Sequence, residues 1–261
     1  MAGIVINVGG VFANSLRVSP DLPWTSRLTV YAVPEFDPAG GVRNLGTLDS
    51  GVVEGTPIIS SGRLLSSDLE SRVVFGSGTP DANGLYLPVF EGGYVIAAVT
   101  KNLQAGGFGG FITRDQDGEG NVNGRYLVAD EPEAGEPEGT VAVGLKNGNG
   151  VEMRIRVPLE TGREYAILGA YYASGCAENT GFKILWMTSD GEYGIQDETT
   201  PSNSPVCDFD SDGNFRKNRV EWGSNANVSE FCESSQFALW RTFLDDADLI
   251  AAARAMLGIS E

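Results

Sequence analysis

The chain has 261 residues and a formal net charge of −17, from 35 acidic residues against 18 Lys and Arg. This charge argues against general nucleic-acid binding, because attraction to phosphates needs a basic surface. Histidine is absent, which excludes Ser-His-Asp and Cys-His catalysis, histidine-ligated zinc and histidine-based pH sensing. No stretch is long and apolar enough to cross a bilayer, so no membrane insertion is expected.

Residues 1–78 are predicted to form an irregular, β-rich region. β-like runs occupy residues 4–8, 28–33 and 72–75, with prolines and many glycines between them. The first run lacks the basic residues of a signal peptide, so synthesis in a cytoplasm without export is expected. Residues 34–55 are rich in turns. They are either the first strands of the following domain or, as we favour, part of an arm that docks on another subunit.

The second domain is predicted to span residues 79–261, after a boundary rich in Gly, Pro, Asp and Asn at residues 76–84. Tyr94–Thr100 is almost continuously apolar, which predicts a strand that is buried on both faces. Residues 151–157 alternate between apolar and charged, as an outer strand of a sandwich does, and residues 147–150 predict a hairpin turn before them.

The segment from residue 236 to residue 257 is the most informative part of the chain. Phe237 and Leu239 are predicted to lie on one side of a strand, and Ala238 and Trp240 on the other. Asp245 is a good N-cap for a helix that follows at once. The residues expected on one face of this helix are Leu249, Ile250, Ala253, Met256 and Leu257. An all-β domain that ends in this way suggests a β-sandwich closed by one helix.

This ending resembles the laminin-G/concanavalin A-like lectin superfamily, whose members often finish with a strand, an aromatic-arginine pair, an acidic cap and a short helix. The matching segments, in the order that the family has them, are residues 165–172, 182–191, 219–223, 237–241 and 244–250. The resemblance covers residues 85–257 and implies a fold class. The expected fold is an all-β, antiparallel β-sandwich (a concanavalin A-like jelly roll) with a short C-terminal α-helix.

The sharpest local motif is an acidic segment in which Asp208, Asp210, Asp212 and Asn214 offer oxygen ligands to a hard cation such as calcium. An EF-hand is excluded, because its twelfth loop position needs a bidentate glutamate and Arg219 stands there. Two interpretations stay open: a looser calcium loop, and a solvated acidic turn, which we favour. No cofactor is required by the sequence.

A second acidic loop carries Asp115, Asp117 and Glu119, which could bind a cation in the same way. Such turns are common on acidic proteins, so the motif is weaker evidence for a cation site.

The chain has three cysteines, Cys176, Cys207 and Cys232, and they lack the spacing of zinc ligands. Free, mostly buried thiols are expected, with a disulfide between the last two as the alternative if the protein reaches an oxidising environment.

No catalytic residue is expected. Glycoside hydrolases need two carboxylates at a set separation, and the chain lacks the Glu-x-Asp-x-Glu run of the glucanase branch.

Glycan binding would need an exposed aromatic ring beside polar groups. Most candidates are expected to pack in the core, namely Trp186, Trp222, Trp240, Tyr171 and Tyr172. Tyr193 follows an Asp-Gly turn and is the aromatic residue expected to be exposed, so it is the predicted glycan-binding residue.

The resemblance and the lack of a catalytic set favour a non-enzymatic virion structural protein of a tailed bacteriophage, such as a capsid decoration, a head fibre or a tail adhesin. Its sandwich would serve adhesion or particle stabilisation. The implied partners are other virion proteins of the capsid or tail, a host surface glycan and further copies of the chain, with a trimer favoured. The expected location is the virion. A free-standing carbohydrate-binding lectin is the alternative, and a glycoside hydrolase is the third hypothesis.

Overall fold

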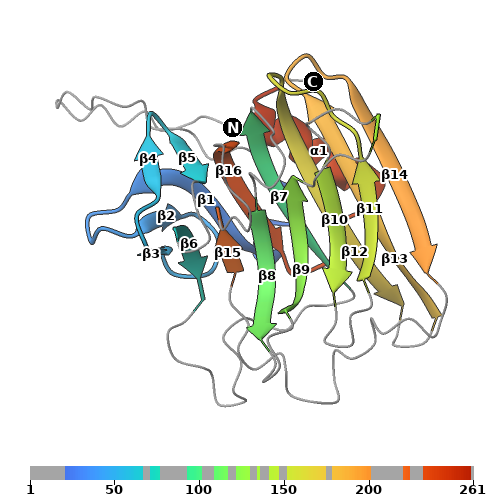
Figure 1. Ribbon diagram of the computed structural model, residues 1–261, viewed down its shortest axis with the longest axis horizontal. Coiled ribbons are helices and arrows are strands. Elements are labelled where there is room, and N and C mark those ends of the chain that lie inside the picture. The colour runs from blue at the N-terminus through green and yellow to red at the C-terminus, as the bar shows by residue number, and fades with distance from the viewer. Residues whose placement is uncertain are drawn as a thin grey trace, which may run out of the picture.

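The computed structural model shows an antiparallel β-sandwich with one α-helix in its described part (Figure 1). The described residues are 21–66, 71–76, 93–101, 109–116, 122–129, 134–135, 141–146, 152–174, 178–200, 220–223 and 232–259. This architecture confirms the predicted all-β sandwich with a short C-terminal helix. None of the described helices has the length and the apolar character that a membrane span requires.

The larger sheet has nine strands in the order β14-β13-β12-β7-β16-β1-β2, and β4 joins it through β5, which pairs with β16. Its strands are β1 (Leu28–Phe36), β2 (Val42–Asn44), β4 (Ile58–Ser60), β5 (Arg63–Ser66), β7 (Gly93–Lys101), β12 (Glu164–Ser174), β13 (Glu178–Thr188), β14 (Tyr193–Thr200) and β16 (Cys232–Trp240). A short 3-10 helix, Thr25–Arg27, leads into β1.

The smaller sheet has seven strands in the order β11-β10-β9-β8-β15-β6-β3. Its strands are β3 (Val52–Glu54), β6 (Arg72–Phe75), β8 (Gly109–Gln116), β9 (Val122–Ala129), β10 (Val141–Lys146), β11 (Glu152–Val157) and β15 (Val220–Trp222). The pairing of β10 with β11 confirms the predicted hairpin, while its turn lies outside the described residues.

The strands between residues 28 and 75 are hydrogen-bonded into both sheets. β1 and β5 both pair with β16, and β6 pairs with β15. The turn-rich residues 34–55 contain the end of β1 and all of β2 and β3. The predicted run at residues 4–8 lies outside the described residues. These pairs join strands of residues 28–75 to later strands within each sheet. The division of the chain into units 1–78 and 79–261 stays a prediction.

The main core lies between the two sheets. Phe237 of β16 stacks on Phe75 and on Trp222 of the facing sheet, with ring centroids 6.3 Å and 5.8 Å apart. All three rings are fully buried. Each buried aromatic ring removes a large apolar area from water, so this contact ties the sheets together.

A second core fills the outer face of the larger sheet, beneath α1 (Asp246–Leu257). Ala238 and Trp240 belong to this cluster, whereas Phe237 and Leu239 belong to the core between the sheets. The predicted alternation along β16 is therefore confirmed. The central strands are covered on both faces, which explains the unbroken apolar run of β7, buried from Gly93 to Thr100.

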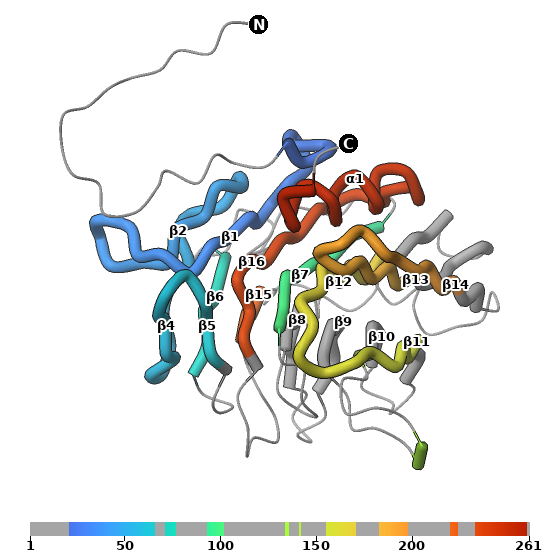
Figure 2. The backbone as a smooth tube through the Cα atoms, turned by 90° about the horizontal axis from the view of Figure 1, so that it is seen from above, coloured from blue at the N-terminus to red at the C-terminus, as the bar shows by residue number. Residues whose placement is uncertain are grey.

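The helix α1 packs on β12 and β13 (Figure 2). Asp245 is its N-cap, as predicted, and its carboxylate accepts a hydrogen bond from the backbone N–H of Asp248 at 2.9 Å. At the other end Gly258 takes a left-handed conformation with φ of 69°, which a glycine adopts at little cost. The buried residues of the helix are Leu249, Ala252, Ala253 and Met256.

Candidate functional site

Of the aromatic residues singled out from the sequence, two are buried, one is exposed and Trp186 is only partly buried, packed against the core between the sheets. Trp222 and Trp240 are fully buried. Their indole N–H groups donate to the hydroxyl of Ser234 at 3.0 Å and to the carbonyl of Pro23 at 2.9 Å. Tyr193 is 47% exposed. The side chains of Tyr171 and Tyr172 lie outside the described part.

The predicted glycan-binding residue, Tyr193, lies at the start of β14, directly after the turn that joins β13 to β14. It pairs in register with Met187 of β13. Met187 and Ile195 both contact the cluster beneath α1, so Tyr193 lies on the helix side of the sheet. Because β14 is the last described strand at this end of the larger sheet, no described strand covers the ring on its outer side.

The turn before Tyr193 is held by backbone and side-chain hydrogen bonds. The N–H of Thr188 donates to the carbonyl of Glu192 at 2.8 Å, and its hydroxyl donates to the same carbonyl at 3.1 Å. That hydroxyl also contacts the carboxylate of Asp190. Gly191 has φ of 88°, a conformation that a residue with a Cβ rarely adopts. Hydrogen bonds within the turn therefore hold the backbone that leads directly into Tyr193.

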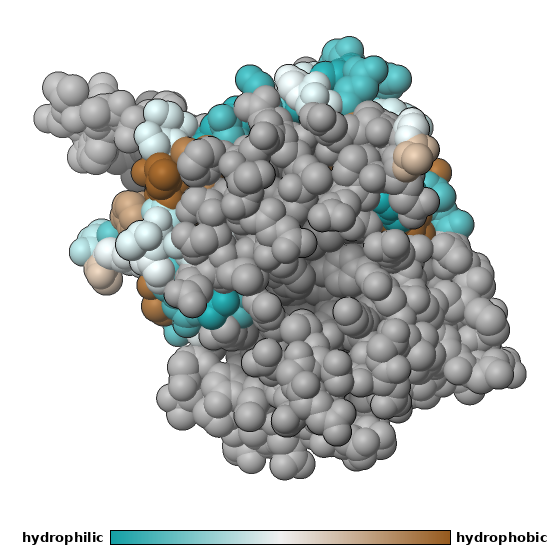
Figure 3. All heavy atoms as spheres, in the orientation of Figure 1, coloured by the Kyte–Doolittle hydropathy of each residue, from teal (hydrophilic) through white to brown (hydrophobic). Residues whose placement is uncertain are grey.

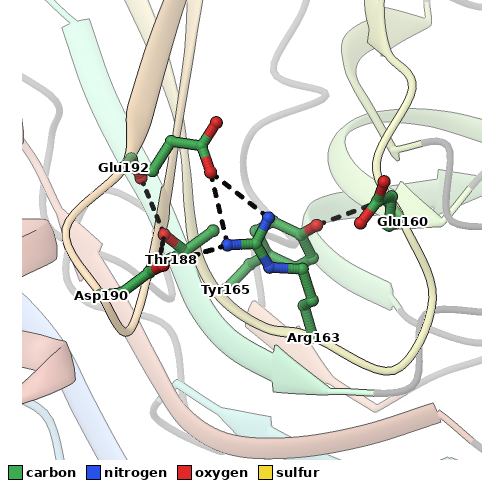
Figure 4. A network of polar contacts seen from close by, with 6 residues as sticks. All are labelled: Glu160, Arg163, Tyr165, Thr188, Asp190 and Glu192. Atoms are coloured by element: carbon green, nitrogen blue, oxygen red, sulfur yellow. Dashed lines mark hydrogen bonds and ion pairs between the residues drawn. The ribbon is translucent and has the colours of Figure 1, made fainter.

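Arg163 closes the turn from the neighbouring segment (Figure 4). Its guanidinium lies 3.2 Å from the carboxylate of Asp190 and 3.3 Å from that of Glu192. The hydrogen bond from the Thr188 hydroxyl lowers the pKa of Asp190, and Arg163 lowers this pKa further. All three charged groups are exposed enough to meet a ligand.

The hairpin also has an aromatic support inside the sandwich. Trp186 stands opposite Gly194, where a Cβ would lie 2.9 Å from the indole ring, so the ring occupies the space that a larger residue would need. The ring meets Tyr165 edge to face, with centroids 6.3 Å apart. Burial raises the pKa of Tyr165, whose hydroxyl accepts a hydrogen bond from the Glu160 N–H at 3.3 Å.

The sequence gives no direct signal for the role of Arg163. Its position follows from strand register. Tyr165 pairs with Thr188 in antiparallel strands, so Arg163, two residues before Tyr165, lies opposite Asp190, two residues after Thr188. The only local hint is that acidic residues flank Gly191 in the turn.

A second charged cluster, which the sequence analysis also missed, lies on the smaller sheet. Arg72 of β6 is 2.8 Å from Glu54 of β3 and 3.6 Å from Glu221 of β15. Glu221 is fully buried, and Arg72 is mostly buried. A buried carboxylate is costly unless a cation lies close to it. We therefore assign this cluster to holding β3 and β15 against β6.

The predicted cation ligands Asp208, Asp210, Asp212 and Asn214 lie outside the described residues, so the calcium loop stays a prediction. The same holds for Asp117 and Glu119, and for the side chain of Asp115, at the end of β8. In the described part of the chain, no group of three or more acidic or cysteine side chains is placed to hold a metal. Cys176 and Cys207 are outside it as well.

Neither models of protein families nor curated protein sequences match this chain. Solved structures do match its fold. The receptor binding domain of botulinum neurotoxin D has 9% identity and a TM-score of 0.57, over 89% of this chain and 53% of that one. The binding domain of botulinum neurotoxin DC in complex with rat synaptotagmin II has 12% identity and a TM-score of 0.53, over 89% and 52%.

A further match is the ligand binding domain of botulinum neurotoxin serotype D in complex with N-acetylneuraminic acid. It has 6% identity and a TM-score of 0.50, over 88% of this chain and 51% of that one. The chain thus spans about half the length of these structures. At such low identity the likeness concerns the β-sandwich fold alone, in agreement with the all-β sandwich expected from the sequence.

Proposed function

We propose that this chain is a non-enzymatic adhesion protein that binds a glycan at the β13–β14 turn. The observation that carries the proposal is the half-exposed ring of Tyr193 beside a turn that Arg163 braces. A tyrosine ring offers a sugar a flat apolar surface and loses little conformational entropy on binding. The neighbouring charged groups supply the hydrogen bonds that fix orientation in such sites.

The fold supports this proposal without identifying the ligand. The structural neighbours are named as receptor binding domains, and one is in complex with N-acetylneuraminic acid. For this chain we expect a different preference. Asp190 and Glu192 both lie against the single charge of Arg163 (Figure 4), so the cluster is net negative. Each like-charge pair costs about 1 kcal/mol at 4 Å in water, so a neutral sugar should bind better than an acidic one.

A glycan array with the purified chain tests the proposal. Wild type should bind a set of neutral glycans, and Tyr193→Ala should lose that binding. Tyr193→Phe keeps the ring and should retain most of the affinity, and Gln196→Ala, on the same strand, is the matched control. Absence of binding to every glycan would remove the glycan role, and equal binding by Tyr193→Ala would place the site elsewhere.

We propose further that the chain belongs to the virion of a tailed bacteriophage, on the capsid or on the tail. The resemblance to laminin-G-like modules and the acidic, glycine-rich composition support this. Mass spectrometry of purified particles should detect the chain, and the isolated protein should bind particles that lack it. Glycan binding without particle binding would favour the free-standing lectin. Release of reducing sugar from polysaccharides would favour the glycoside hydrolase.

A further inference from the structure

Alternate residues of β14 form a row on the helix side of the larger sheet, and we call Tyr193, Ile195 and Asp197 the β14 row. Ile195 packs against the core beneath α1 and pairs in register with Leu185, which is part of that core. Because alternate residues of a strand share one face, Tyr193 and Asp197 lie on this side as well. In Figure 3, hydrophobic and hydrophilic residues lie side by side where Figure 1 places β14.

The members of the β14 row differ in what they offer a ligand. Tyr193 is 47% exposed and the side chain of Asp197 is 44% exposed, whereas Ile195 is partly buried between them. The tyrosine ring offers a flat apolar surface, Ile195 continues it, and the carboxylate offers hydrogen-bond acceptors. A sugar needs both kinds of contact, because its ring carries C–H groups on its faces and hydroxyl groups around its edge.

Asp197 is oriented by a lysine of the neighbouring strand. Lys183 stands opposite it in register, and its ammonium group lies 3.6 Å from the carboxylate of Asp197 and 2.6 Å from that of Asp246 in α1. Opposite charges that face each other across two strands stabilise the pair, and an ordered side chain loses less entropy on binding. One cation against two carboxylates leaves this group net negative, so it also favours a neutral sugar over an acidic one.

The separation of the two exposed members sets the size of the ligand. Tyr193 and Asp197 are four residues apart on one strand. A strand rises about 3.3 Å per residue, so their positions are about 13 Å apart along β14. A single sugar ring is shorter than this span, whereas several linked sugars in an extended chain can reach from one residue to the other.

The edge of β14 is also able to meet an extended peptide, which would pair with the backbone of the strand. Its side chains disfavour that occupant. Gln196 and Asp197 are both exposed and point to opposite faces of the strand. Polar and charged residues on an outer strand discourage the addition of another strand. The side chains of one face, and not the backbone, are therefore the groups that β14 offers.

We propose that the β14 row is one extended subsite, in which Asp197 is the second contact residue for a linear, neutral oligosaccharide. This inference rests on the proposed function, because it takes Tyr193 as the first contact residue. A single sugar meets Tyr193 alone. A longer chain crosses Ile195 and donates hydrogen bonds from its hydroxyl groups to the carboxylate of Asp197.

Isothermal titration calorimetry of the full chain tests the proposal. The probes are glucose, galactose, mannose and N-acetylglucosamine, each as the monosaccharide and as its linear oligomers. For the sugar that binds, affinity should rise about tenfold or more from monosaccharide to oligomer, as expected for hydrogen bonds to a charged group. Asp197→Ala should remove most of this gain and leave the affinity for the monosaccharide unchanged. Tyr193→Ala should weaken the binding of both.

Gln196→Ala is the matched control, because Gln196 is exposed on the same strand but on its other face. It should leave both affinities unchanged. In Asp197→Ala, Lys183 keeps its ion pair with Asp246, so thermal unfolding should show an intact fold. Equal losses for monosaccharide and oligomer in Asp197→Ala would overturn the proposal, because they would indicate a general disturbance of the hairpin and not a lost contact.

The outcomes separate this inference from the proposed function. If sugars bind through Tyr193 with the same affinity for monosaccharide and oligomer, the proposed function stands and the extended subsite is overturned. If no sugar binds, both are overturned. Binding of an extended peptide that raises the hydrogen-exchange protection of the β14 amides would also overturn the inference, because the occupant would then be an added strand.

Discussion

Trp240 and Trp24 belong to neighbouring segments, since the indole N–H of Trp240 donates to the carbonyl of Pro23, but their environments are opposite. Trp240 is fully buried between β16 and α1, whereas Trp24 is exposed and donates from its indole N–H to Asp248 at 2.6 Å. The burial of Trp240 is predictable from the alternation along its strand. The position of Trp24 is not, because it depends on where the segment before β1 meets a helix more than two hundred residues later.

Trp240→Ala should destabilise the protein by about 3–5 kcal/mol, because the change removes a buried ring and leaves a cavity. Trp24→Ala should cost about 1 kcal/mol, the usual worth of one hydrogen bond. Urea unfolding followed by circular dichroism measures both. A loss of a few tenths for Trp240→Ala would contradict its burial beneath α1.

Asp190 should resist protonation on acidification. Its pKa is lowered, so the stability that its carboxylate contributes is present above its ordinary pKa of about 3.8 and is lost as the pH falls through the lower folded-state value. Thr188→Val removes the hydroxyl that has the largest effect and should bring the Asp190 pKa back toward its ordinary value. A carboxyl NMR titration of both proteins checks this, and identical midpoints would contradict it.

Among the elements, the β13–β14 hairpin was the most predictable from the sequence. The strand and Asp-Gly turn at residues 182–191 were implied by the family resemblance, and the exposure of Tyr193 was expected from its place after that turn. The ion pairs of Arg163 with the turn and the packing of Trp186 over Gly194 depend on cross-strand register, which one sequence does not determine. The candidate site was therefore predicted at its central ring but not in its surroundings.

Gly194→Ala should destabilise the hairpin by about 1–3 kcal/mol, because the new methyl group would overlap the indole ring of Trp186. In a Trp186→Ala background the same change should cost almost nothing, since the two sites are coupled through contact. Thermal unfolding of the four proteins measures this coupling. Additive effects would mean that the ring moves aside freely.

The Arg72 cluster should behave as a coupled unit that holds edge strand β3. Arg72→Met leaves Glu221 buried without this cation and should cost about 3–5 kcal/mol, whereas the double change Arg72→Met with Glu221→Leu should cost less. Glu54→Gln, at a more exposed site, should cost about 1 kcal/mol or less. Chemical unfolding gives the three values, and a double variant weaker than Arg72→Met would contradict the assignment.

For the whole molecule, the sandwich class and its closing helix were predictable because their signals are local: strand alternation, an N-cap and one apolar helical face. The distribution of the first strands over both sheets was not predictable from the residues. Short strands such as β2, β3 and β4 have three residues each and carry little periodic signal. Their partners are set by packing between distant segments, which composition and spacing do not reveal.

The position of β16 between β1 and β7 has a consequence for biosynthesis. β1 and β7 are synthesised long before residue 240, and until β16 emerges neither can pair with it at the centre of the larger sheet. Nascent chains arrested before residue 232 should therefore stay sensitive to protease, and those released after residue 259 should become resistant. Folding of the larger sheet is thus expected to wait until β16 has emerged, and its strands stay unpaired and prone to aggregation in the interval.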